Sequence, residues 1–250
     1  MMIDLKDEKQ RYYYLEKCIT RKPIDFYGLK IYHPIIDDIF EMGEDSYKEL
    51  LMPFILSNEY LKLPNIVSLL EDIYLSDDYM RELLIISLSY FMKLERNDFK
   101  VFRPESKNGI KGKIIIKDTL IINDEKFNEL KILIQMICNV PELTKADLES
   151  LNNDKPISES KKKLLEGRKK SKTTKIEEKR MKLVNVYDYI VHKPPMPDYD
   201  RYLDWSIYQL YNTYTNMIQK ENIQFTYDVI TNGMGTKDMK LESLAEKIIK

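Results

Sequence analysis

The sequence contains little cysteine, glycine, proline or net charge, and each shortage excludes a class of protein. Two cysteines in 250 residues cannot form a disulfide framework, so we expect buried, reduced thiols at Cys18 and Cys138. Seven glycines and ten prolines argue against a loop-rich or all-β fold. A net charge of −1 gives no overall field that would attract nucleic acid or a membrane.

Long apolar runs and catalytic motifs are also missing. The longest apolar stretch, residues 83–92, is shorter than the ~18 residues that a membrane span requires, and the acidic N-terminus does not resemble a signal peptide. We therefore expect a cytoplasmic protein. The sequence has no HExxH or GxGxxG motif, and residues 109–113 have the wrong spacing for a phosphate-binding loop.

Several polar residues imitate catalytic or metal sites without completing one. Asp198 and Asp238 follow the order of a metal-dependent nuclease, but a long helix separates them and no strand is indicated around Asp238. The acidic pairs at residues 37–38, 44–45 and 77–78 fit helix starts better than a metal site. His33 has no identifiable partner, so we expect a surface or hinge histidine. The sequence predicts no enzyme activity, catalytic residue, cofactor or metal.

What the sequence does contain indicates a mainly α-helical (α+β) fold. We predict an N-terminal helical domain over residues 1–140, beginning with an adaptable lead-in over 1–33 that ends in a strand at 27–32. Helices are expected at 35–42, at 45–55 with an interruption or kink at Pro53, at 66–75, at 78–94, and from Asn123 or Asp124 to about 139. A small antiparallel β insertion is predicted around residues 98–123, with turns at Asn108-Gly109 and at 117–119.

Residues 141–182 lose apolar periodicity, and from residue 161 they become strongly basic. Eleven Lys or Arg stand against three Glu over 161–182, so this segment has a net charge of about +8 and the rest of the chain about −9, an asymmetry that the near-zero total conceals. A solvated linker or exposed helix is the simplest interpretation. A contact surface for an acidic protein partner, or for nucleic acid, remains open; Lys169, Lys170 and Lys172 are the candidates. Aromatic side chains that would stack on bases are absent from it.

Residues 183–250 form a predicted C-terminal helical module. Apolar periodicity returns at 183–191, prolines at 194, 195 and 197 form a connector, and a last helix is expected at 241–249. Between them, Ser206 and Gln209 have capping-box spacing at the start of a helix. Behind this cap, one apolar face is predicted. Its residues are Ile207, Leu210, Tyr211, Tyr214, Met217 and Ile218.

Three segments resemble, in the right order, the tail-assembly chaperones of phages and prophages of Gram-positive (Firmicutes) bacteria. The first runs from Tyr27-Gly28-Leu29 to a "GEDxY"-like corner at residues 43–47. The second, residues 97–139, resembles the hydrophobic β insertion of these proteins and the helix that follows it. The third is the "IYQLY" helix at 207–211 followed by Gly233-Met234-Gly235. In the closing segment, Leu244 or Ala245 stands where the family often has Trp.

This resemblance implies a non-catalytic binding function in phage tail morphogenesis. Such chaperones coat the tape-measure protein, keep its apolar stripes from aggregating, and yield to tail-tube subunits. The expected contact residues are Tyr208, Tyr211 and Tyr214, together with the three lysines of the basic segment. Self-association stays open, and a membrane partner is not expected. The alternatives are a small nucleic-acid-binding regulator and a structural virion component; a chaperone would stay in the host cytoplasm and be absent from the mature virion.

Overall fold

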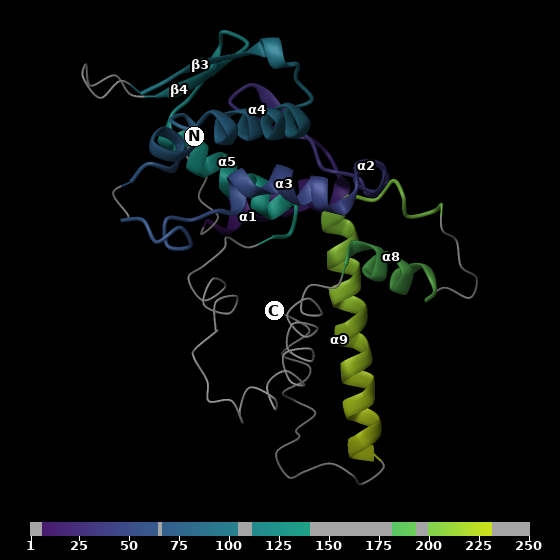
Figure 1. The fold of residues 1–250 in the computed structure, drawn as a ribbon. Coiled ribbons are helices and arrows are strands. Elements are labelled where there is room, and N and C mark those ends of the chain that lie inside the picture. The colour runs from purple at the N-terminus through teal and green to yellow at the C-terminus, as the bar shows by residue number, and fades with distance from the viewer. Residues whose placement is uncertain (1–6, 65–66, 105–111, 141–181, 194–199, 232–250) are drawn as a thin grey trace, which may run out of the picture.

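The computed structural model describes residues 7–64, 67–104, 112–140, 182–193 and 200–231. In these residues the fold is mainly helical with two small antiparallel sheets, which confirms the predicted fold class. Figure 1 shows a helical body that carries a sheet on one side, and a long helix, α9 (Ile207–Thr231), that projects from the opposite side.

The N-terminal segment is a helix and a hairpin rather than the predicted lead-in. Helix α1 (Glu8–Thr20) begins at Asp7, whose carboxylate accepts a hydrogen bond from the amide of Lys9 at 3.0 Å. Its apolar stripe is narrow, since only Tyr14 and Cys18 are buried. Because the neighbouring residues are polar, the sequence showed no helical period here. Strands β1 (Ile24–Phe26) and β2 (Leu29–Ile31) follow as an antiparallel pair, so the predicted strand is one half of a hairpin.

Helices α2 (Ile36–Met42) and α3 (Glu44–Ile55) agree with the predicted pair, and Gly43 separates them. Of the two expectations for Pro53, an interruption is wrong, because α3 continues to Ile55, and a kink stays a prediction. Proline so close to the end of a helix removes only one backbone hydrogen bond. The carbonyls at this end have side-chain partners: the Tyr74 hydroxyl donates to Pro53 O at 3.1 Å, and Gln135 Nε2 donates to Phe54 O at 2.6 Å.

The helix expected at 66–75 is a short π-helix, η1 (Leu69–Tyr74), which Ser68 caps through the amide of Glu71 at 2.9 Å. Helix α4 (Asp78–Met92) follows, with Asp77 as its N-cap. The acidic pairs at 37–38, 44–45 and 77–78 all lie at helix starts, as predicted.

The β insertion is confirmed as a three-stranded sheet in the order β3-β4-β5. The strands are β3 (Phe99–Phe102), which follows the short 3-10 helix η2 (Arg96–Asp98), β4 (Lys113–Ile116) and β5 (Leu120–Ile122). The three residues between β4 and β5, Lys117, Asp118 and Thr119, form the predicted turn, in which Lys117 and Asp118 have positive φ. The Asn108-Gly109 turn lies outside the described residues.

Helix α5 (Asp124–Ile137) starts where the sequence predicted, because Asn123 accepts a hydrogen bond from the amide of Lys126 at 3.1 Å. The C-terminal part contributes α8 (Leu183–Val191) and α9. One hydrophobic core takes in residues from both parts, from Tyr14 to Leu210. The residues predicted to divide the chain at 141–182 lie, except Lys182, outside the described residues, as does the helix expected at 241–249.

Candidate protein-binding surface

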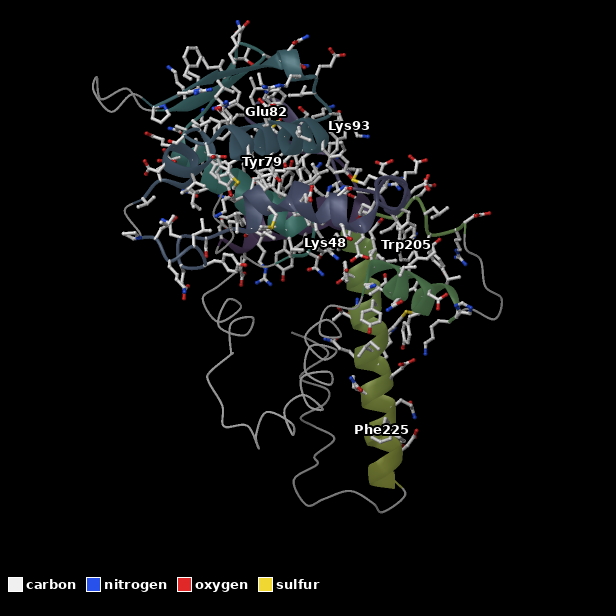
Figure 2. The ribbon with its side chains drawn as sticks, viewed as in Figure 1. Lys48, Tyr79, Glu82, Lys93, Trp205 and Phe225 are labelled. Atoms are coloured by element: carbon white, nitrogen blue, oxygen red, sulfur yellow. The ribbon has the colours of Figure 1, made fainter. Side chains whose placement is uncertain are left out.

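The base of α9 is held by local and long-range hydrogen bonds. The predicted capping box forms: the Gln209 amide donates to Ser206 Oγ at 3.2 Å, and the Ser206 amide donates to Gln209 Oε1 at 2.9 Å. The segment before α2 forms backbone hydrogen bonds with the same turn. The Ile207 amide donates to Pro34 O at 3.1 Å, and the Ile36 amide donates to Trp205 O at 2.9 Å. The start of α9 is therefore anchored to the helical body (Figure 2).

The three candidate tyrosines lie on the proximal half of α9, half-buried against the protein's own core. Tyr208, Tyr211 and Tyr214 all pack against the hydrophobic cluster. The ring of Tyr214 meets that of Tyr189 edge-on, with 5.2 Å between centroids. Burial raises the pKa of Tyr208. Much of this predicted face is thus occupied internally, and its role in binding a partner stays a prediction. Lys169, Lys170 and Lys172 lie outside the described residues.

Helix α8 braces α9 through a group of polar contacts at its C-terminal end. The hydroxyl of Tyr189 and the ammonium of Lys193 both donate to the carboxylate of Glu221, and Lys193 Nζ lies 4.7 Å from the centroid of the Tyr189 ring. The hydrogen bond from Lys193 lowers the pKa of Glu221, and the same bond raises the pKa of Lys193. These contacts orient α9 as far as Glu221.

Beyond Glu221, α9 continues away from the body and exposes large aromatic side chains (Figures 1 and 2). Phe225, one turn further on, is 70% exposed, and Tyr227 is 47% exposed. Phe225 follows Ile218 by seven residues and Tyr214 by eleven, so all three lie on one face of the helix. The apolar stripe that is half-buried near the base of α9 therefore emerges into solvent at Phe225. We call this stripe, Tyr214, Ile218 and Phe225, the α9 stripe.

Sequence reasoning did not select Phe225. The signal was present, because the predicted face extends to it by one further heptad step from Ile218. What the sequence could not show is which part of the face is covered. Tyr12 and Tyr79 are exposed to the same degree, at 71% and 69%, but Phe225 differs from them because it continues a half-buried stripe on a helix that other segments hold in place.

The structure also locates the residues considered for chemistry. His33 is buried, which corrects the expectation of a surface or hinge histidine. Its Nε2 lies 3.1 Å from Lys22 O, and burial lowers its pKa. Within the described residues, His, Cys, Asp and Glu form no group of three that could hold a metal ion. Asp198 and Asp238 lie outside those residues.

The two cysteines are buried free thiols, as predicted, and burial raises the pKa of each to about 12. Both therefore remain protonated at neutral pH. No helix among the described residues combines the length and apolar content needed to cross a membrane. In comparisons with models of protein families, with curated proteins and with solved structures, nothing matches the chain.

Proposed function

We propose that this protein is a non-catalytic tail-assembly chaperone that binds the tape-measure protein of a phage and keeps it dispersed until tail-tube subunits polymerise around it. The observation that carries the proposal is the α9 stripe, whose distal residue Phe225 is 70% exposed on a helix that α8 and the segment before α2 hold in place. The three segments that resemble this family support it, because the third of them is the beginning of α9 itself.

The proposed recognition is helix against helix. A tape-measure protein presents long amphipathic helices, and the α9 stripe offers side chains at four- and seven-residue spacings, on one helix face that such a helix can pack against. Because α8 and the segment before α2 already hold α9 in place, less conformational entropy is lost when the partner binds. Covering the exposed ring of Phe225 contributes about 1.5–3 kcal/mol.

Co-expression with the tape-measure protein of the same phage, followed by pull-down and light scattering, tests the proposal. A dispersed complex is expected, while the tape-measure protein alone should aggregate. Phe225→Ser should weaken the complex by roughly one to two orders of magnitude. Ile86→Ser is the matched control, because Ile86 is 53% exposed on α4 in the helical body, apart from the α9 stripe, and should bind as the wild type does.

Two results would contradict the proposal. The first is a tape-measure protein whose aggregation is the same with and without this chain. The second is a complex that Phe225→Ser and Ile86→Ser affect equally, which would move the contact away from α9. Purified phage particles provide an independent test: an assembly chaperone acts in the host cytoplasm and should be absent from them, whereas a structural tail component would remain.

A further inference from the structure

Helix α9 begins at a short contact with the loop before α2. Backbone hydrogen bonds connect residues 34–37 with residues 203–207, and among them Pro34 O accepts from the amide of Ile207, the first residue of the helix. Figure 2 places Trp205, which belongs to this contact, at the base of α9. We call the pairing of 34–37 with 203–207 the α9 joint. It fixes the point at which the helix leaves the body.

His33 lies directly before the joint, and its side chain reaches another element. The residue is buried, and its Nε2 lies 3.1 Å from Lys22 O, just beyond the end of α1. On the other side of His33 in the sequence, the Tyr32 amide donates to Phe91 O of α4 at 2.8 Å. One imidazole therefore connects the end of α1 with the loop that anchors α9, in a stretch of backbone that is held on both sides.

The hydrogen bonds of the ring define its protonation state. A carbonyl oxygen can only accept, so Nε2 carries the proton and donates it to Lys22 O, and Nδ1 is the unprotonated nitrogen. Nδ1 is buried and has no hydrogen-bond partner among the described residues. A second proton would therefore reside on Nδ1, where that part of the chain offers it no acceptor, and an unpaired buried donor costs free energy. The site suits a neutral imidazole and not an imidazolium.

The charges around His33 act in the same direction. Burial lowers the pKa of His33 by more than the hydrogen bond to Lys22 O raises it, and Arg21 lowers the pKa further. The ammonium of Lys93 lies 5.1 Å from the centroid of the neighbouring Tyr32 ring, so a further cation is close to the loop. In the part of the chain that the structure describes, no carboxylate is among the groups that act on the imidazole. A second proton on His33 would thus meet basic neighbours and no counter-charge.

We infer that the α9 joint is a pH-sensitive switch: protonation of His33 drives its ring out of this site, loosens Pro34 beside it, and frees the base of α9 to move. In the open joint the ring is in water, where its pKa has the ordinary value of about 6.5. Above that pH the closed joint is favoured in full. Each pH unit below it favours the open joint by up to about tenfold, until the closed form is protonated as well. This inference concerns the chain alone and does not depend on the partner of the α9 stripe.

Hydrogen exchange of the whole chain between pH 7.5 and 5.5, corrected for the intrinsic rate of each amide, tests the inference. The opening constants of the Ile36 and Ile207 amides should rise by up to about tenfold per pH unit below about 6.5. They should not change in low urea, because local opening exposes little surface, whereas a core amide such as that of Leu88 exchanges through global unfolding and responds. Trp205, the single tryptophan of the chain, should report the same change by fluorescence.

The chain contains two histidines, so the second one, His192, provides the matched control. It is exposed at the C-terminal end of α8, and His192→Gln should keep the pH response. His33→Gln should lose it, since an amide nitrogen can replace Nε2–H but does not titrate. Opening constants that are the same at pH 7.5 and 5.5, a response that His33→Gln retains, or one that His192→Gln abolishes would overturn the inference. If His33→Gln fails to fold, the NMR signals of the His33 ring decide: a titration midpoint that coincides with the Trp205 change supports the switch, and a different midpoint overturns it.

Discussion

Removing the cap of α9 should loosen the helix that carries the candidate surface. Ser206 is fully buried, and its hydroxyl accepts the hydrogen bond from the Gln209 amide. Ser206→Ala should therefore cost about 1 kcal/mol of unfolding free energy. Gln209→Ala should cost more, about 2 kcal/mol, because it also removes the 2.7 Å hydrogen bond from Gln209 Nε2 to Ile19 O, which ties α9 to α1.

The double variant shows whether these residues act as one cap. Because each side chain bonds the other's backbone amide, the costs should not add: we expect about 2 kcal/mol for the pair rather than about 3 kcal/mol. Urea unfolding followed by circular dichroism measures these values, and a loss of 1 kcal/mol corresponds to roughly 2–4 °C in melting temperature for a chain of this size. Hydrogen exchange of the backbone amides in the first turns of α9 should accelerate in the same variants.

Asn212→Ala, an exposed change in the same helix, provides the control and should stay within about 0.5 kcal/mol of the wild type. Strict additivity of Ser206→Ala and Gln209→Ala, or an unchanged stability in both, would refute the reasoning.

Three further outcomes follow from burial. Leu210→Ala removes a fully buried side chain from the base of α9 and should cost about 2–5 kcal/mol in urea unfolding; Ile86→Ala, at an exposed site, should cost far less. Burial lowers the pKa of His33, so stability should be complete above the ordinary histidine pKa of about 6.5 and fall as the pH drops below it; a His33→Asn variant that kept the same slope between pH 7.5 and 5.5 would contradict this. Because burial raises the pKa of Cys18 and Cys138 to about 12, a thiol reagent at pH 7.5 should label neither in the native protein and both in denaturant; rapid labelling of the native protein would show that one is accessible.

Much of the secondary structure could be predicted because its signals are local. The caps at Asn123 and Ser206, and the turn at Lys117 and Asp118, are satisfied within about four residues of chain, so residue type and spacing suffice to recognise them. The same applies to the β insertion, whose three strands alternate buried and exposed side chains.

Elements that depend on distant neighbours were misjudged. Helix α1 buries only two side chains, too few to produce a visible period, and packing against α9 contributes to holding it in place. His33 looked like a surface residue because nothing beside it in the sequence reveals that Lys22 O and the surrounding fold enclose it. Pro53 looked like a helix breaker, yet Tyr74 and Gln135, from two other helices, hydrogen-bond the carbonyls of that turn.

The candidate surface divides in the same way. By itself, the sequence determined that an apolar face begins behind the cap at Ser206 and runs through Tyr211 and Tyr214, because periodicity records which side of a helix is apolar. Only the tertiary structure decided which part of that face is free. Helix α8 and the core cover its first turns, and Phe225 extends beyond them into solvent. The physical reason is that the exposure of a helix face depends on what packs against it. Here α8 and the core pack against α9, and these long-range contacts cannot be recognised from the local pattern of residues.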